Sequence, residues 1–178
     1  MLLEKGLDPV IIPAGIVENL PFPMEAEAAV MYLALKKALS VEAGLNPPRE
    51  PDAPVILAAD TVVYHQKIIG KPKNKEEAFA VLSALSGNRH SVITGVALLK
   101  AGEPVRRLFY QVSEVFFKPY SEEELTAYVN TPEPYDKAGG YAIQGTFQKY
   151  VDHIEGDVDN VIGLPWGLVE QELKTLSL

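Results

Sequence analysis

The chain has 178 residues, 47% of them hydrophobic, which is enough apolar sequence to build one domain with a sizeable core. Its formal net charge of −8 gives an averaged field that repels a nucleic acid polymer, so we expect no such partner. It has no cysteine, and this excludes disulfides, thiolate catalysis and a cysteine-bound metal.

No apolar stretch reaches the roughly 18 residues that a membrane span needs, and the first residues lack the basic and apolar regions of a signal peptide. We therefore expect a soluble, cytoplasmic protein with no membrane partner. Lys71, Lys73 and Lys75 nevertheless cluster in one short stretch, where they could hold a small anion despite the acidic average.

The first half of the chain predicts one long helix and a strand that stops at an acid. Strong helix formers over residues 24–44, with a glycine suited to a C-cap, predict the helix. The apolar run after Pro54 predicts a strand ending at Asp60, with a continuation or hairpin over residues 62–69. Around these we expect a short strand over residues 8–12, a proline-punctuated loop over 13–23 and a surface connection over 46–54.

The second half predicts helices between hairpin-linked strands. Asn74 and Glu77 have the spacing of a capping box before a helix over residues 75–85, and Ser121 and Glu124 repeat it before a helix to about residue 129. The other expected elements are strands over 90–99 and 105–117, a glycine-marked loop over 136–145, a strand over 147–154 and a closing helix after Pro165. This order predicts an α/β protein whose mixed sheet is flanked by helices.

Asp60 is the first candidate for chemistry. A carboxylate at the carboxyl end of a buried strand lies where open α/β sheets gather their ligands. It can equally cap a turn, with Thr61 helping, and its position alone does not separate these two interpretations.

Two further segments carry groups that suit a phosphate ligand. Gly70-Lys71-Pro72 presents an ammonium on a restrained turn, although a solvated turn lysine fits the tripeptide as well. Residues 136–145 hold three glycines, a charge pair and Gln144, a composition that suits close approach to a ligand but also a tight connecting loop. Neither common nucleotide-loop signature is present, and the 3 histidines form no local metal motif.

Taken in chain order, these stretches resemble the Maf family of nucleoside triphosphate pyrophosphatases, once named for inhibition of septum formation. The motifs that carry the resemblance are Ala59-Asp60-Thr61-Val62-Val63, Gly70-Lys71-Pro72, Leu85-Ser86-Gly87 with HSVITGV after it, DKAGGYAIQG, and Asn160-Val161-Ile162-Gly163-Leu164-Pro165. The resemblance covers essentially the whole chain. It implies a single domain over residues 1–178, with an elongated, twisted inosine-triphosphatase-like sheet, two lobes, a central cleft and often a homodimer.

The resemblance also assigns roles to matching residues. Asp60 corresponds to the family's central acid and Glu18 to its acid after the first loop, so both are expected to hold a divalent metal, Mg²⁺ or Mn²⁺, or to align the attacking water. Lys37 and Lys71 correspond to the helix lysine and the lysine of G-K-P, and are expected to stabilise phosphate charge. The residues expected to contact the substrate are Thr61, Lys137, Gly139 and Gln144.

The implied reaction is hydrolysis of a nucleoside triphosphate between its α and β phosphates, and the loop A-G-G-Y-A-I-Q-G favours the dTTP/UTP branch over 7-methyl-GTP. One departure supports an alternative. Family members begin with a strand leading into S-x-S-P-R-R, whose serine and arginines contact the phosphates, and this sequence starts after that motif. The alternative is a nucleotide-binding or partner-binding protein with little or no turnover, and the departure also predicts an exposed sheet edge.

Overall fold

A computed structural model of the chain describes residues 2–45 and 53–176. The α-helices are α1 (Ala26–Gly44), α2 (Lys75–Leu85), α3 (Glu122–Val129), α4 (Val158–Ile162) and α5 (Trp166–Leu176). The strands are β1 (Val55–His65), β2 (Lys67–Ile69), β3 (Arg89–Lys100), β4 (Arg106–Phe117) and β5 (Val151–Glu155). Short 3-10 helices cover η1 (Leu3–Lys5), η2 (Glu133–Asp136), η3 (Ala138–Gly140) and η4 (Thr146–Tyr150).

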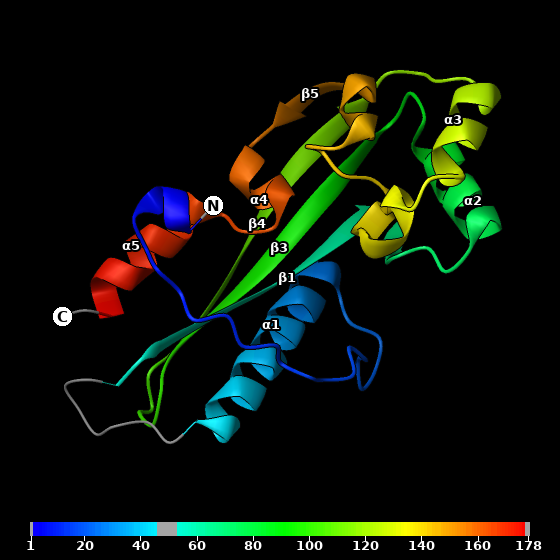
Figure 1. The fold of residues 1–178 in the computed structure, drawn as a ribbon. Helices are drawn as coiled ribbons and strands as arrows, with labels where there is room; N and C mark the ends of the chain where they lie inside the picture. Colours follow the sequence, from blue (N-terminus) through cyan, green and yellow to red (C-terminus); the bar gives the residue numbers. More distant parts are fainter. Residues whose placement is uncertain (1, 46–52, 177–178) are drawn as a thin grey trace.

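The strands form one sheet in the order β2-β1-β3-β4-β5 (Figure 1). The three long strands β1, β3 and β4 pair with one another over most of their length, whereas β2 and β5 each pair with only one end of a long strand. The α/β class with a helix-flanked sheet is therefore confirmed. The strand directions are more uniform than the predicted mixed sheet, because every pairing among the described strands is antiparallel.

Side chains of β3 alternate between two helix layers. Ala97 and Leu99 pack in one apolar cluster with residues of α1, whereas Val96 and Leu98 pack in another with Val169 of α5. The two helices therefore cover opposite faces of the sheet (Figure 1). Gly95 brings α1 unusually close, since a Cβ there would lie 2.5 Å from the backbone nitrogen of Met31.

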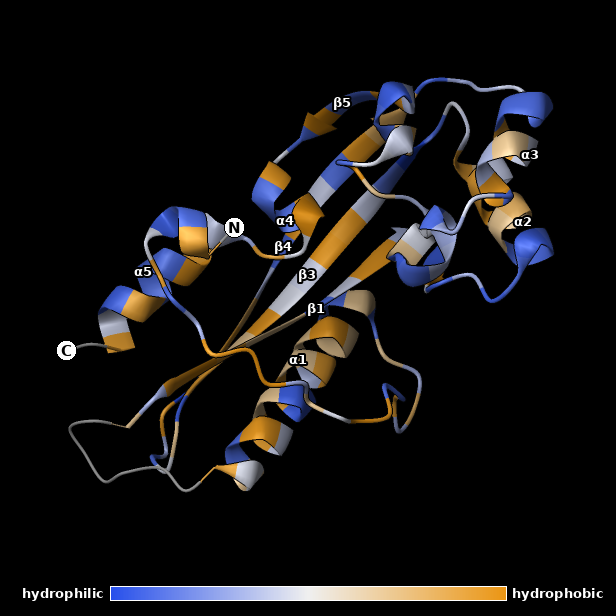
Figure 2. Cartoon of the chain, in the orientation of Figure 1, coloured by the Kyte–Doolittle hydropathy of each residue, from blue (hydrophilic) through white to orange (hydrophobic). Residues whose placement is uncertain are grey.

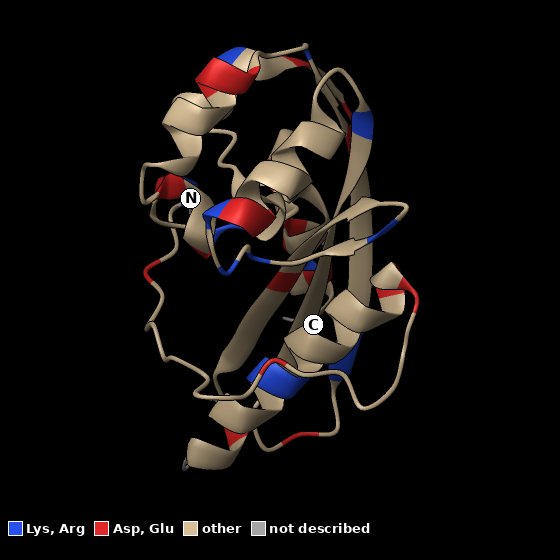
Figure 3. Ribbon diagram, turned by 90° about the vertical axis from the view of Figure 1, so that its right-hand side faces the viewer, with Lys and Arg blue, Asp and Glu red and all other residues tan. Residues whose placement is uncertain are grey.

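The helices α2 and α3 cover an aromatic core that α1 does not reach. The fully buried ring of Phe147 lies 5.4 Å from the ring of Phe117, 4.5 Å from that of Tyr128 and 4.8 Å from that of Tyr150. Figure 2 shows that apolar residues gather along the strands and in α1. Figure 3 shows acidic residues in the first turns of α2 and α3, where they favourably oppose the positive ends of the helix dipoles.

Local sequence signals located most helices correctly. The predictions of α1, α2, α3 and α5 are confirmed, and Ser121 with Glu124 forms the complete capping box. Before α2 the Asn74 side chain accepts a hydrogen bond from the Glu77 amide, but the Glu77 carboxylate accepts from the amide of Lys73 instead of closing on Asn74. The short helix α4 was not predicted. No helix within residues 2–45 and 53–176 is long and apolar enough to cross a membrane.

Three strand predictions were wrong in extent or kind. Residues 8–12 form no strand, and the side chains of Val10 and Ile11 are 87% and 86% exposed. The strand predicted to end at Asp60 continues to His65, whereas the continuation or hairpin predicted over residues 62–69 is confirmed by the antiparallel pairing of β1 with β2. The first part of residues 147–154 is the 3-10 helix η4, so β5 begins at Val151. Of the connection predicted over 46–54, residues 46–52 lie outside the described residues.

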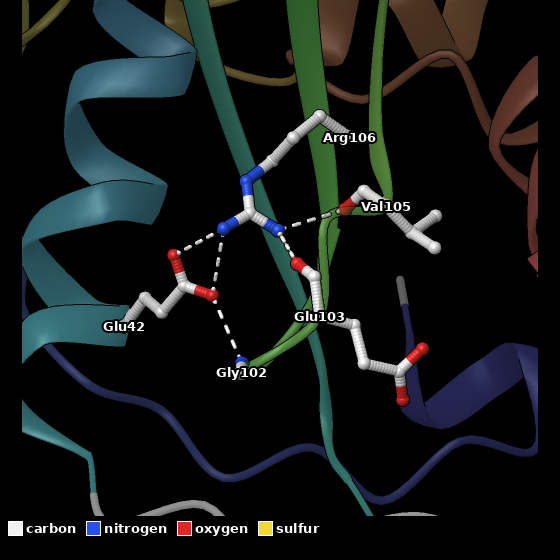
Figure 4. A network of polar contacts seen from close by, with 5 residues as sticks. All are labelled: Glu42, Gly102, Glu103, Val105 and Arg106. Carbon is white, nitrogen blue, oxygen red and sulfur yellow. Dashed lines mark hydrogen bonds and ion pairs between the residues drawn. The ribbon is translucent and has the colours of Figure 1, made fainter.

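Charged groups fasten the end of α1 to the turn between β3 and β4 (Figure 4). One guanidinium nitrogen of Arg106 donates to both carboxylate oxygens of Glu42, at 3.0 and 2.8 Å. The amide of Gly102 donates to the same carboxylate at 3.1 Å, and the other guanidinium nitrogen donates to the carbonyls of Glu103 and Val105. Glu42 thus receives hydrogen bonds from both Arg106 and Gly102, which ties the end of α1 to the turn between β3 and β4.

Candidate active site

A cavity of about 760 Å³ lies beside β1 and is lined by segments far apart in the sequence. Its walls come from the loop before α1, from α1 and β1, from the turn after β2, from the loop over residues 133–145, and from the end of α4. Every predicted site residue except Gly139 lines it. The volume is that of an ordinary small-molecule site, for which about 300–1,000 Å³ is typical.

Asp60 enters this cavity from the middle of β1. It pairs in register with Gly95 of β3, and cross-strand partners point to the same face, so its carboxylate faces α1. Only Val63, Tyr64 and His65 of β1 pair with β2. Among the described residues, no strand lies along the rest of that edge of β1. Asp60 is only 9% exposed, but its carboxylate borders the cavity, so β1 can carry this acid in its middle.

Lys37 of α1 joins the two predicted acids. Its ammonium nitrogen lies 2.6 Å from Oδ1 of Asp60 and 2.9 Å from Oε1 of Glu18. It also donates to the carbonyl oxygen of Ala59 at 3.5 Å. Three separate parts of the chain, the loop before α1, the helix itself and β1, thus meet at one ammonium group.

A neighbouring lysine holds the loop that carries Glu18. The ammonium of Lys36 donates to the carbonyl of Val17 and to Oδ1 of Asn19, each at 2.8 Å, and so fixes the residues on both sides of Glu18. Further along α1, the hydroxyl of Ser40 donates to the carbonyl of Ala14 at 2.7 Å. The two consecutive lysines on α1 therefore have different partners: Lys36 binds the loop, and Lys37 contacts the acids.

The surroundings push the two carboxylates in opposite directions. Burial raises the pKa of Asp60 more than the nearby Lys37 ammonium lowers it. The hydrogen bond from Lys37 lowers the pKa of the more exposed Glu18. Burial alone would lower the pKa of Lys37, but its hydrogen bonds to Asp60 and Glu18 outweigh that effect and the pKa is raised. Paired acids with diverging pKa values are a recurrent feature of sites that use one as a proton acceptor.

The remaining predicted residues line other parts of the wall. Lys71, which follows β2, contributes a positive field at both carboxylates, and Lys137 lies in the loop opposite with its ammonium 2.5 Å from Asp136. Gln144 lines the cavity from the same loop. Thr61 lines it too, although its hydroxyl is engaged 2.9 Å from that of Thr94 on the face of the sheet opposite α1.

Gly139 has a structural reason to be glycine. Its φ of +72° lies in the left-handed region, and a Cβ there would lie 2.7 Å from a methyl group of Val63. Its amide donates to the carbonyl of Gly70 at 3.0 Å, which fastens the loop to the turn that carries Lys71. The glycine therefore acts behind the cavity wall and is not one of the residues that line it.

Sequence reasoning missed two groups that support the 133–145 loop. The Glu133 carboxylate accepts hydrogen bonds from the amide and hydroxyl of Thr146, at 3.2 and 2.7 Å, and from the hydroxyl of Tyr128. The buried His90 lies 2.6 Å from the hydroxyl of Tyr141. No sequence pattern signalled these contacts, because they join residues that lie 5 to 51 positions apart in the sequence.

The arrangement suits a polyanionic ligand with a cleavable bond. Ammonium groups of Lys37, Lys71 and Lys137 can oppose phosphate charge, while Asp60 and Glu18 can orient water or a metal. Within the described residues, no group of three or more histidine or acidic side chains is placed to hold a metal on its own. Because Mg²⁺ is commonly bound by one or two carboxylates together with substrate phosphates, the pair of oxygens converging on Lys37 fits a metal that shares its coordination with a triphosphate.

Comparison with known proteins identifies relatives over the full length of the chain. The family model described as Maf-like protein matches residues 1–176. A dTTP/UTP pyrophosphatase of Desulfitobacterium hafniense is 45% identical over 186 residues, which cover 100% of this chain and 81% of that protein. Proteins of the same name from a Geobacillus species and Agathobacter rectalis are 43% and 40% identical, and the matches cover 94% and 99% of this chain.

Proposed function

The chain belongs to the Maf-like protein family, and we propose that it hydrolyses dTTP, UTP and related nucleoside triphosphates to the monophosphate and pyrophosphate. The observation that supports this most directly is the cluster of Glu18, Lys37 and Asp60 in a cavity of nucleotide size. The cavity residues come from positions 18 to 163, which supports a single catalytic domain. A cytoplasmic location is part of the proposal, because nucleoside triphosphates are made and consumed there.

In the proposed reaction a water oxygen attacks the α phosphorus, and the bond from this phosphorus to the bridging oxygen breaks. The bridging oxygen leaves with the electron pair as part of pyrophosphate. Asp60 accepts the proton of the water, because burial raises its pKa and its carboxylate borders the cavity. Lys71 and Lys137 hold the phosphates, and Gln144 and Thr61 contact the nucleotide.

A divalent metal is part of this proposal. Glu18 and Asp60 would hold it, with the substrate phosphates completing its coordination. When bound, the metal supplies positive charge to the phosphate oxygens on which negative charge builds. Glu18 suits this role because its lowered pKa keeps it ionised across the neutral range.

The proposal is tested by a nucleotide panel in H₂¹⁸O with identification of the products. We expect pyrophosphate together with a monophosphate that carries the label, because water attacks the α phosphorus. Asp60→Asn protein purified in parallel is the control for contaminating phosphatases. Release of orthophosphate, or label in the pyrophosphate, would contradict the proposed bond cleavage.

We also propose that a second copy of the chain covers the free edge of β4. Among the described residues β5 pairs only with the end of β4 that begins at Glu114. The rest of that edge has Leu108, Tyr110 and Val112 on one side, with 43%, 45% and 38% of their surfaces exposed. Antiparallel pairing about Tyr110 sets Leu108 against Val112 of the second copy, so the free part of the strand is complementary to itself.

Light scattering after size-exclusion chromatography tests this pairing. We expect a dimer for the unchanged protein and a monomer for Tyr110→Arg, because two arginines would then meet at the axis. Tyr64→Arg, at an exposed position of β1, is the control and should remain dimeric. A Tyr110→Arg protein that stays dimeric would rule out this edge as the interface.

A further inference from the structure

The ammonium of Lys37 uses the same oxygen atoms that a divalent cation would need. An ammonium has three N–H donors, and here they find Oδ1 of Asp60 at 2.6 Å, Oε1 of Glu18 at 2.9 Å and the carbonyl oxygen of Ala59 at 3.5 Å. Carboxylate and carbonyl oxygens are also the ligands of hard divalent metals. The lysine therefore fills a cation position between the two acids.

The lysine and a metal cannot both occupy this position. The Asp60 side chain is 9% exposed and that of Lys37 21%, so water screens the pair poorly and two cations in contact would repel strongly. No group of three or more acids or histidines in the described part of the chain offers the metal a protein site of its own. A metal that reaches Glu18 and Asp60 must therefore displace the ammonium.

A triphosphate provides the displaced ammonium with new partners. Lys37, Lys71 and Lys137 line the same cavity. Phosphates that bind in this cavity therefore lie near the Lys37 side chain. Its long, flexible stem allows the ammonium to turn from the carboxylates to a phosphate oxygen without moving α1. The exchange is favourable only with the polyanion present, because without it the ammonium would lose its partners.

We propose that Lys37 keeps the nucleotide-free site closed to divalent metal, so that the metal enters together with the triphosphate. This inference rests on the proposed function, because it takes a triphosphate as the group that draws the lysine away. It assigns Lys37 two successive partners: the acids before the nucleotide binds, and the phosphates afterwards. It also predicts that the free enzyme leaves Mn²⁺ or Mg²⁺ in solution rather than storing it.

The test is calorimetric titration of the nucleotide-free protein with Mn²⁺, which requires no turnover. We expect weak binding to the unchanged protein, and binding tighter by at least about tenfold to Lys37→Met, which keeps most of the length of the side chain but removes its charge. Lys37→Arg retains the cation and should bind Mn²⁺ as weakly as the unchanged protein. Circular dichroism of each variant establishes that it is folded.

Lys71→Met is the matched control, because it removes one positive charge from the same cavity without vacating the position between the acids. It should tighten Mn²⁺ binding far less than Lys37→Met does. Equal effects of the two substitutions would overturn the inference, since the cause would then be the general field of the cavity. Tight Mn²⁺ binding by the unchanged, nucleotide-free protein would overturn it as well.

A second measurement compares Asp60→Asn in two backgrounds, and its first arm needs no Lys37 variant. Asp60→Asn in the unchanged background should leave the already weak Mn²⁺ binding almost as it was, whereas in the Lys37→Met background it should abolish the gain. A large loss in the unchanged background would mean that Asp60 already held the metal beside Lys37. Failure of the proposed function would look different, because the product assay would then yield no pyrophosphate whatever the Mn²⁺ titrations gave.

Discussion

Replacing Gly95 by alanine tests whether the seating of α1 on the sheet sets the geometry of the site. The added Cβ would lie 2.5 Å from the backbone nitrogen of Met31 and from the carbonyl carbon of Val30. Ordinary contact begins near 3.4 Å, and the obstacle is helix backbone rather than a side chain that can rotate away. The helix must therefore withdraw by about 1 Å, the difference between these separations.

We expect two consequences of comparable importance. Overpacking of this kind costs about 1–3 kcal/mol of unfolding free energy, and backbone contact places Gly95→Ala near the upper end. Gly95 is also the cross-strand partner of Asp60, so withdrawal of α1 stretches the 2.6 Å contact between Lys37 and Asp60. Misplacement of a catalytic group by about 1 Å lowers turnover on the order of a hundredfold.

Urea unfolding followed by circular dichroism gives the first quantity, and initial rates of pyrophosphate release give the second. Gly167→Ala is the matched control: it lies in α5, no atom stands within 4 Å of the added Cβ, and its φ is not positive. This control should gain roughly 0.5–1 kcal/mol of stability and keep its activity. A Gly95→Ala protein with unchanged stability and turnover would refute the close seating, and lost stability with full turnover would show that the site tolerates the shift.

Four further substitutions separate chemistry, binding and stability. Asp60→Asn should lower turnover by at least about a hundredfold while the fold and triphosphate binding survive, and near-normal initial rates would show that the proton acceptor lies elsewhere. Lys71→Ala should instead raise KM along with its loss of kcat, because a phosphate partner is removed; an unchanged KM would exclude that role. Gly145→Ala should destabilise the protein by about 1–3 kcal/mol in thermal or urea unfolding, since its Cβ would push the Glu133 carboxylate away from its hydrogen bonds with Thr146 and Tyr128, and a neutral effect would show that this loop yields freely. Burial lowers the pKa of His90 from 6.5 to about 4, so the native state binds fewer protons than the unfolded state. The contribution of neutral His90 to the free energy of unfolding is therefore fully present above pH 6.5, and about 3 kcal/mol is lost as the pH falls towards 4. Urea unfolding across this range should give a flatter pH profile for His90→Gln than for the unchanged protein, and parallel profiles would assign the acid sensitivity to other groups.

Helices were predictable because their signals are local. The box of Ser121 and Glu124 and the cap of Asn74 are formed by residues three apart, so the sequence carries both partners of each hydrogen bond. The β3–β4 hairpin was predictable for the same reason, since two apolar runs flank a short turn. The short helix α4 gave no comparable signal, because its five residues depend on buried contacts: Asn160 donates to the carbonyl of Val92 and to the hydroxyl of Ser113.

Strands failed where pairing, rather than composition, decides. The segment around Val10 and Ile11 is β-branched and apolar, yet among the described residues it has no neighbouring strand and runs exposed over the surface. Residues after Phe147 also have strand character, but Phe147 and Tyr150 both turn toward the aromatic core, and the 3-10 turn satisfies this spacing better than an alternating strand. Neither outcome follows from the residues themselves, because each depends on what lies beside them.

The acid inside the apolar run of β1 shows how far a sequence can locate a site. A carboxylate there was attributed to the end of a strand, where open α/β sheets gather their ligands, but β1 continues for five more residues, to His65. The strand tolerates Asp60 because its outer edge is open in the described structure and Lys37 reaches it from the helix above. Register with Gly95 thus does two things at once: it turns the carboxylate toward α1, and it lets α1 come close enough for the lysine to meet it. Substitutions that loosen α1 should therefore lower activity before they unfold the protein. The site depends on the distance between α1 and the sheet, whereas the fold depends on all the packing contacts of the helix and the sheet.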